Sequence, residues 1–244
     1  MRRLIHRVLP RAARRQLGDV RRGVISTCQV ELDCHAEQCC VSELCALIIH
    51  DHGRPATVYG YDGGKGKTLK IVDAVLVYID PSTGDRWMLI INQALLVPGL
   101  RHPLLCSNQL RLNDIRVNDE PKHMVPTPTE YHHAITIKTP DGNERYDELV
   151  IPLYMSGVFS YFEGTKPTVE EWESAHDDWC LHLTYASPEW EPAKLGLEEI
   201  ESAMLDENGY VVTDRDAGYC NQQRISRVIA SLSKDRVFNP LLLG

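Results

Sequence analysis

Two segments that lie far apart in the sequence carry residue types suited to acid–base chemistry. Residues 30–33 (VELD) have the character of a strand that delivers Asp33 into a tight loop, and residues 104–110 (LLCSNQL) that of a strand leading into a short helix. The loop neighbours of the aspartate are Cys34, His35 and Ala36. Two carboxylates held close together share a proton, so one accepts a proton from water while the other donates. Asp33, at the end of its strand, is a candidate for one such carboxylate.

Strands are the elements that must position these segments. Residues 68–79 and 87–97 read as a long antiparallel hairpin joined by a turn at 80–85, and residues 135–138 and 148–153 read as a second hairpin joined at Asp141-Gly142. Residues 157–162 are predicted to form a last short strand. Many short strands with turn signals and almost no amphipathic helix predict an all-β fold, a small closed β-barrel with one short helix.

Between the two candidate segments lies a stretch with mixed signals. The apolar run 46–49 ends in a turn-like break at 50–53 (HDHG), and residues 56–59 read as a strand. A glycine-rich hairpin tip follows, with Gly60, Tyr61, Gly63 and Gly64. This tip nearly spells a phosphate-binding loop at 66–68, but the following residues predict a strand rather than the required helix.

These residues together resemble a retropepsin-type aspartic protease, in the version found in copia-type retrotransposon Gag-Pol polyproteins. The most specific match is a Val-Pro-Gly-Leu stretch at 97–100 that leads into paired leucines and a Ser-x-Gln-Leu helix. The resemblance implies that Asp33 activates water and that a supporting motif lies behind it. The supporting residues are Leu104, Leu105, Cys106 and Asn108.

The resemblance also implies a flap and a partner. The glycine-rich tip sits where the family's flap would admit peptide and then exclude water. Because the chain offers one well-placed aspartate, an active enzyme would be a homodimer that cuts its own polyprotein. No cofactor is implied. The family's Asp-Ser/Thr-Gly pattern is replaced by Asp33-Cys34-His35; Cys34 is a weaker hydrogen-bonding group than Ser, and His35 adds bulk.

Charge and composition divide the 244 residues into four predicted regions. Residues 1–23 form a basic linker with eight Arg and one acid, residues 24–125 the barrel, residues 126–162 a β-hairpin extension, and residues 163–244 an acidic, largely disordered linker. The overall charge is −8 and the chain after residue 23 is acidic. Only the basic head, residues 1–23, is therefore suited to contact nucleic acid, and only weakly. We expect the chain to be a fragment of a polyprotein gene.

The compartment is predicted from what the sequence lacks. No apolar run suits a membrane span and no secretory signal is apparent, so we expect an intracellular protein, cytoplasmic or nuclear. The basic head leaves mitochondrial import as a lesser alternative. Without an export signal, the eight cysteines are expected to be reduced.

Two alternatives to the protease stay open at this point. One is a non-catalytic β-barrel remnant that serves as a structural or interaction module. The other is a zinc-binding module, because thiols and imidazoles crowd the region from 34 to 52. Its proposed ligands are Cys34, Cys39, Cys40 and Cys45.

Overall fold

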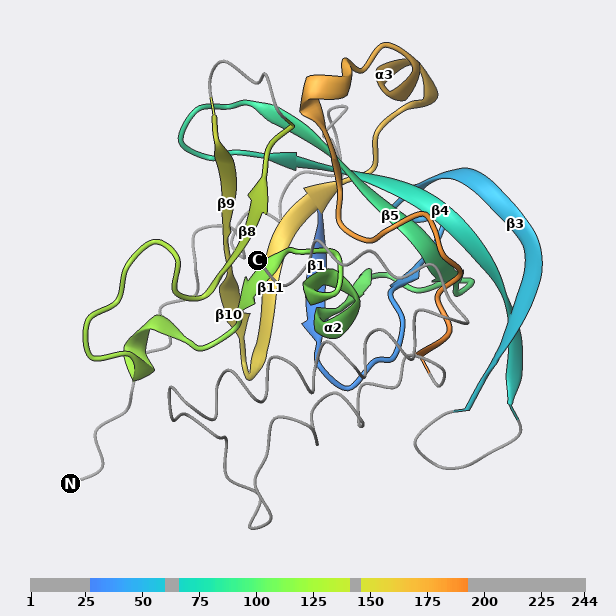
Figure 1. Cartoon of the computed structure of the whole chain (residues 1–244), viewed down its shortest axis with the longest axis horizontal. Helices are drawn as coiled ribbons and strands as arrows, with labels where there is room; N and C mark the ends of the chain where they lie inside the picture. Colours follow the sequence, from blue (N-terminus) through green and yellow to red (C-terminus); the bar gives the residue numbers. More distant parts are fainter. Residues whose placement is uncertain (1–26, 60–65, 141–145, 193–244) are drawn as a thin grey trace, which may run out of the picture.

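A meander of three long antiparallel strands forms the largest part of the fold (Figure 1). The computed structural model describes residues 27–59, 66–140 and 146–192. The meander consists of β3 (Leu47–Val58), β4 (Lys67–Ile79) and β5 (Arg86–Leu96). The predicted turn between β4 and β5 is present: the amide of Asp80 donates to the carbonyl of Asp85 (2.9 Å), and Gly84 takes a φ of 80°.

The remaining strands of the main sheet pair around this meander. They are β1 (Thr27–Asp33), β2 (Cys40–Val41), β6 (Leu104–Cys106), β10 (Tyr154–Ser156), β11 (Phe159–Thr165) and β12 (Cys180–His182). The strand order is β10-β11-β1-β6-β2-β5-β4-β3, with β12 paired to β5. One further pair, Thr165 with Val77, joins β11 to β4.

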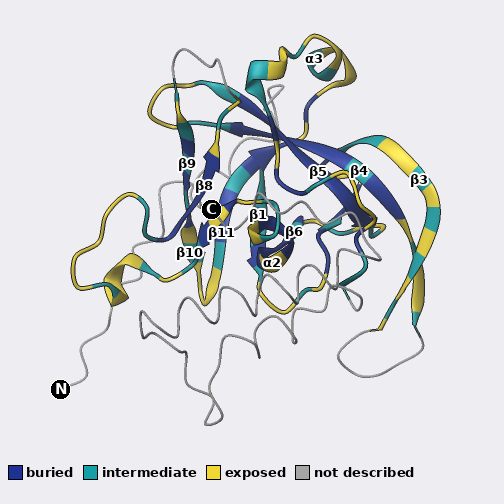
Figure 2. Ribbon diagram, in the orientation of Figure 1, coloured by how far each residue is buried: buried dark blue, intermediate teal, exposed yellow. Residues whose placement is uncertain are grey.

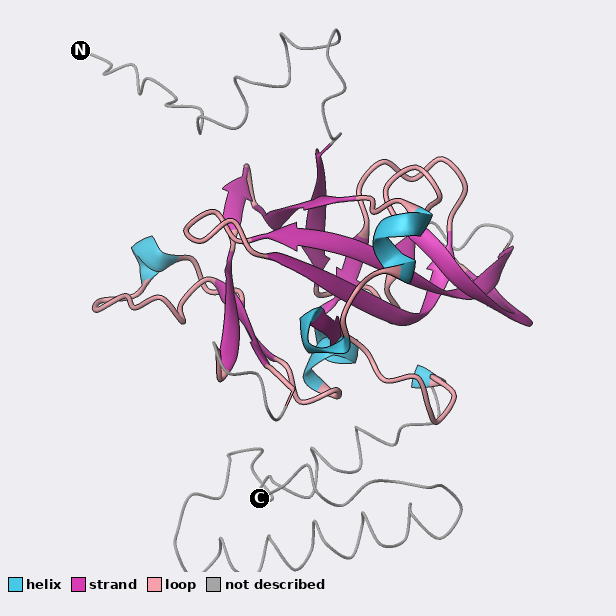
Figure 3. Ribbon diagram, turned by 90° about the horizontal axis from the view of Figure 1, so that it is seen from above, coloured by secondary structure: helices cyan, strands magenta, loops and turns pink. Residues whose placement is uncertain are grey.

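A second, three-stranded sheet and a few short helices complete the fold. The second sheet has the order β7-β8-β9, from β7 (Arg116–Asn118), β8 (Ala134–Lys138) and β9 (Glu148–Pro152). The helices are α2 (Ser107–Arg111), α3 (Val169–Glu173) and the 3₁₀ turns η1 (Lys122–Met124) and η2 (Asp177–Trp179). Strands make up the body of the molecule, with the helices at its periphery (Figure 3). The all-β prediction is confirmed, and the one expected helix is α2.

One continuous hydrophobic core contains residues from both the predicted barrel (24–125) and the predicted extension (126–162). Val30 on β1, Leu105 on β6 and Phe162 on β11 belong to the same buried cluster as Ile135 and Ile151 of the second sheet. The predicted division into a barrel ending at 125 and an extension beginning at 126 therefore does not separate two cores. Apolar side chains from both segments leave water by packing against each other, which makes them parts of one folding unit.

The residues just beyond the predicted extension are folded, which corrects the expectation of a linker from 163 onward. A second buried cluster lies on the other side of β4 and β5, where Trp172, Ala175 and Cys180 pack against residues that include Val77 and Met88. Both faces of β5 are thus covered, and residues 87–95 are all buried (Figure 2). Residues 193–244 and the basic head 1–23 lie outside the described residues.

Residues 50–53 do not form the predicted turn that would end the strand. They lie inside β3, which runs on to Val58 with register shifts against β4 between Ile48 and His50 and between Asp51 and Pro55. Gly53 takes a φ of 69°, which glycine adopts without strain. The irregularity is a bulged stretch within a strand.

Candidate active site

Asp33 is the last residue of β1 and lies beside the segment that begins at Leu104. The two strands are parallel, with Leu32 opposite Leu105 and Asp33 opposite Cys106. Leu32 and Leu105 are buried, which is the apolar lead-in that the sequence predicted for the aspartate. The strand pair therefore carries Asp33 to the point where β6 ends and α2 begins. Figure 2 shows β1, β6 and α2 next to one another.

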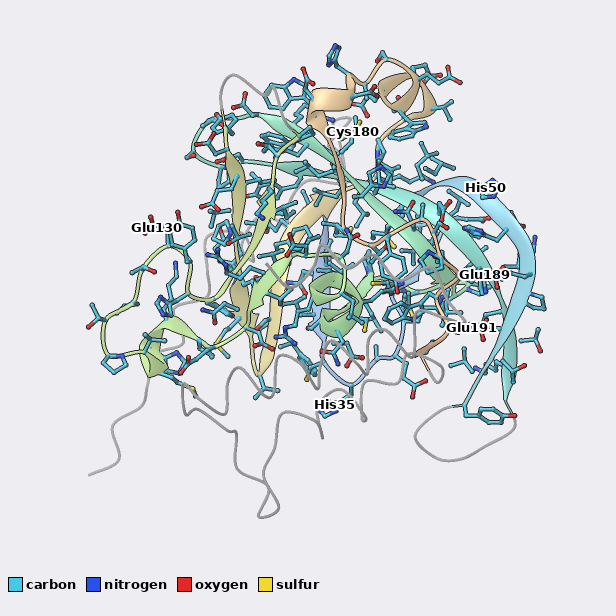
Figure 4. All side chains as sticks on the ribbon, viewed as in Figure 1. His35, His50, Glu130, Cys180, Glu189 and Glu191 are labelled. Carbon is cyan, nitrogen blue, oxygen red and sulfur yellow. The ribbon has the colours of Figure 1, made fainter. Side chains whose placement is uncertain are left out.

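A tight turn follows the aspartate. The amide of His35 donates to Oδ1 of Asp33 (2.9 Å), and the amide of Ala36 donates to the Asp33 carbonyl (3.4 Å). Asp33 is half-buried, whereas Cys34 and His35 are exposed. Figure 4 shows His35 at the surface of the molecule. One carboxylate oxygen thus holds the turn, and the loop remains open to a second molecule.

A buried group of side chains ties this loop to α2. The sulfur of Cys106 accepts from the amide of Gln109 (3.3 Å) and caps the helix. The amide of Cys39 donates to Oε1 of Gln109 (2.8 Å), and the amide of Cys106 donates to the sulfur of Cys39 (3.3 Å). Cys106 thus connects the segment after the loop to α2 through Cys39 and Gln109, and Leu105 pairs with Leu32 of β1.

Asn108 does not take part in this support. Its side chain is exposed and accepts from Arg111 (3.3 Å) on the same helix. The adjacent Gln109, which is 1% exposed, supplies the polar contact that the sequence motif suggested. A buried glutamine needs hydrogen-bonding partners, so its position next to an apolar strand was the available clue.

The thiols around the aspartate are held neutral. Burial raises the pKa of Cys40 to about 11, and the negative charge of Asp33 adds to the effect. Burial also raises the pKa of Cys106, again with a contribution from Asp33, and raises that of Cys39 well above its usual value. The seven cysteines within the described residues are free, as expected.

The proposed zinc ligands do not converge. Cys34 is exposed, Cys39 contacts the Cys106 amide, and Cys45 contacts the hydroxyl of Ser42 (3.4 Å). In residues 27–59, 66–140 and 146–192, none of the four sulfurs belongs to a group of potential ligands close enough to share one ion. The structure contradicts that ligand set because the fold gives each thiol its own surroundings.

The predicted flap lies at the tip of the β3–β4 hairpin. The hairpin's last described pair is Val58 with Lys67. The predicted flap residues Gly60, Tyr61, Gly63 and Gly64 lie outside the described residues. The segment after Gly66 is strand β4, in agreement with the rejection of a phosphate-binding loop.

A segment that the sequence analysis missed is bound to the same loop. This strap, residues 183–192, follows β12 and has Trp190 buried at its end. The indole Nε1 of Trp190 donates to the carbonyl of Glu37 (2.8 Å), and its amide donates to Oε1 of Gln93 (2.7 Å). Glu189 and Glu191 mark the strap beside the β3–β4 curve in Figure 4. An isolated tryptophan in an acidic stretch was the only sequence clue to this contact.

The raised thiol pKa values predict slow alkylation. At pH 8 the thiolate fraction of Cys40 should be on the order of a hundredfold lower than that of an unperturbed thiol. Peptide mass spectrometry after iodoacetamide treatment should find Cys34 labelled first and Cys39 last, with the difference lost in urea. Equal labelling rates in the native protein would contradict the burial of these thiols.

The same shift gives a pH dependence of stability. The native pKa of Cys40 lies above its ordinary value of 9.0, so the unfolded chain loses the proton first. This contribution to the free energy of unfolding is complete below pH 9 and is lost as the pH rises through about 11. Cys28, whose pKa burial raises to about 12, acts in the same direction. Urea unfolding from pH 7 upward should show the decline.

Comparison of the chain with protein-family models, with curated proteins and with solved structures found no match. Across the described ranges, no helix has the length and apolar character needed to cross a bilayer. The fold and the site define an all-β protein that presents a half-buried, strand-borne aspartate next to a helix start.

Proposed function

We propose that this chain is a retropepsin-like aspartic endopeptidase of the copia type, active as a homodimer. The observation that carries the proposal is the parallel pairing of β1 with β6, which sets Asp33 opposite Cys106 at the start of α2. An aspartate that only formed a turn would not require the start of α2 and the buried Gln109 next to it.

The chemistry follows from two such carboxylates at a two-fold axis. Like charges at short separation do not both ionise, so the pair holds one proton and titrates as a unit. One Asp33 takes a proton from water, and its symmetry mate donates to the peptide carbonyl. The exposed loop at Cys34 and His35 leaves room for the second copy to approach.

The retropepsin-like closed barrel is part of the same proposal. The pairing of Thr165 with Val77 supports it, because it links β11 back to β4 and so connects the two ends of the path β11-β1-β6-β2-β5-β4. The long β3–β4 hairpin supports a flap in the same way, since its strands are continuous up to the glycine-rich tip. The substrate is the polyprotein that contains this sequence, with residues 1–23 as the only region suited to nucleic acid.

The proposal is tested with the full-length chain and a mixture of peptides of diverse sequence. We expect cleavage from acidic to neutral pH, inhibited by a pepstatin-like transition-state analogue and unaffected by a metal chelator. Cleavage that resists the inhibitor and stops with the chelator would overturn the aspartic mechanism.

A second candidate function is a non-catalytic β module, and the loop sequence favours it. Cys34 stands where a hydroxyl would lock the loop, and His35 stands where glycine would let the backbone approach water. Both side chains are exposed, so replacing them should not disturb the core.

The double variant Cys34→Ser, His35→Gly separates the two candidates. If the chain is an enzyme, we expect the variant to cleave peptide faster than the wild type by about tenfold, because the hydroxyl forms a stronger hydrogen bond than the thiol. Circular dichroism and thermal unfolding serve as the folding control. If the double variant is folded and neither it nor the wild type cleaves peptide at any pH, the non-catalytic module is favoured.

A further inference from the structure

A cluster of two imidazoles and one carboxylate lies across β3 and β4, apart from the aspartate loop. His50 and Asp73 are directly paired across the two strands, and His52 follows two residues along β3 on the same face. The potential ligand atoms of the three residues lie within 4.8 Å of one another. His35 and His50 occupy well-separated positions in Figure 4, so the two sites are distinct.

We propose that His50, His52 and Asp73 bind one divalent transition-metal ion such as Zn²⁺. Two imidazole nitrogens and a carboxylate oxygen are a ligand set that zinc commonly uses, with water at the open position. Ligand atoms around one tetrahedral zinc ion lie about 3.3 Å apart, given bonds of about 2.0–2.1 Å. Small side-chain rotations therefore suffice to close the cluster around an ion.

The carboxylate is already oriented by the fold. Oδ1 of Asp73 accepts from Nε2 of His52 (2.7 Å) and from the backbone amide of Gln93 (2.7 Å). The Gln93 residue is 1% exposed and takes a positive φ of 54°, which aims its amide at this position. Hydrogen bonds of this kind hold metal-binding carboxylates in place.

The third ligand is free to move. The His50 side chain is exposed and makes no hydrogen bond to another described residue, and its ring lies 4.8 Å from that of His52 in an edge-to-face arrangement. The intervening Asp51 is engaged elsewhere, because it accepts from Lys70 (2.8 Å) and from the amide of Gly53 (2.9 Å). The nearby Arg54 is held by the side-chain oxygen of Gln93 (2.6 Å). Neither charged neighbour occupies the cluster.

Metal binding exchanges one contact for another. The hydrogen bond from His52 to Asp73 is given up. The neutral imidazole of His52 changes tautomer, with its proton on Nδ1 instead of Nε2, so that Nε2 is free to bind the ion. The ion then joins β3 to β4 at the irregular stretch between Ile48 and Pro55. An ion at this position would brace the base of the long hairpin.

The test uses the reduced, chelator-treated full-length protein titrated with Zn²⁺ in a calorimeter. We expect one zinc site that weakens at least tenfold in His50→Ala, since losing even an outer-shell partner costs that much. The His50 side chain is exposed, so the variant should fold. The matched control is His123→Ala, another exposed histidine on a short 3₁₀ turn, which should bind zinc as the wild type does.

Two further readouts make the outcome decisive. Co²⁺ bound at this site should show no thiolate-to-cobalt charge-transfer band, because the ligands are nitrogen and oxygen. Zinc should raise the melting temperature of the wild type and of His123→Ala but not of His50→Ala. Absence of zinc binding, equal binding by His50→Ala, or a strong thiolate band would each overturn the proposal.

Discussion

Peptide cleavage by this protein is expected to fall by on the order of a thousandfold or more when Asp33 is replaced by Asn. The amide has nearly the same shape as the carboxylate, so it can still accept from the His35 amide and hold the turn. It cannot share a proton with its symmetry mate or take one from water. The kcat of the purified variant, measured on the best peptide, gives the result.

The control for Asp33→Asn is Glu37→Gln, which removes an exposed carboxylate four residues along the same loop. This variant should keep wild-type activity within about twofold, since it lies outside the strand-borne position. Mixing wild type with excess Asp33→Asn should also suppress activity, because most dimers would then hold one aspartate. Activity that survives the replacement of Asp33 would remove the aspartic mechanism.

The largest expected effect on stability comes from Gln93→Ala, at about 3 kcal/mol in the free energy of unfolding. The buried side chain donates to the carbonyls of Tyr185 (3.1 Å) and Pro188 (2.9 Å). Its oxygen accepts from the amide of Trp190 (2.7 Å) and from Arg54 (2.6 Å). Alanine would leave these partners buried or half-buried without their hydrogen bonds.

Urea unfolding monitored by tryptophan fluorescence measures this effect. The matched control is Gln29→Ala on β1, where the glutamine is only half-buried and the loss should stay below about 1 kcal/mol. Limited proteolysis should also show the strap of Gln93→Ala cut more readily than that of the wild type. Equal stability of the two variants would mean that the strap contributes little to the fold.

Hydrogen exchange of the Trp190 indole reports on the same contact. Its Nε1 donates to the loop that follows Asp33, through the carbonyl of Glu37. Release of the strap therefore frees the far end of the candidate active loop. The Gln93→Ala variant thus connects stability with the site, even though residue 93 lies far from the aspartate in the sequence.

Strand patterns were predictable because they depend on local periodicity. The hairpin expected from 68–79 and 87–97 is observed as β4 and β5, with ends that differ by at most one residue. The segments around Asp33 and Leu104 were also identified as a strand and a strand–helix pair. Their residue types alone allowed this, since apolar runs bounded by turn residues favour such elements.

The folded region after residue 162 was not predictable in the same way. Its apolar residues follow no period, and their burial depends on a surface that β4 and β5 provide from elsewhere in the chain. The unbroken apolar run of β5 was a clue, because a strand with apolar residues on both sides needs cover on both faces. Only the tertiary structure shows that residues 169–180 supply that cover.

The sequence by itself determined the all-β class, the strand that carries Asp33 and the helix that starts after Cys106. These features arise from neighbouring residues, whose spacing along the chain sets the local conformation. The tertiary structure decided which distant groups meet: Asp33 with Cys106, Trp190 with Glu37, and His50 with Asp73. Such contacts depend on strand order and register, which are set by burial of the whole core rather than by any one segment.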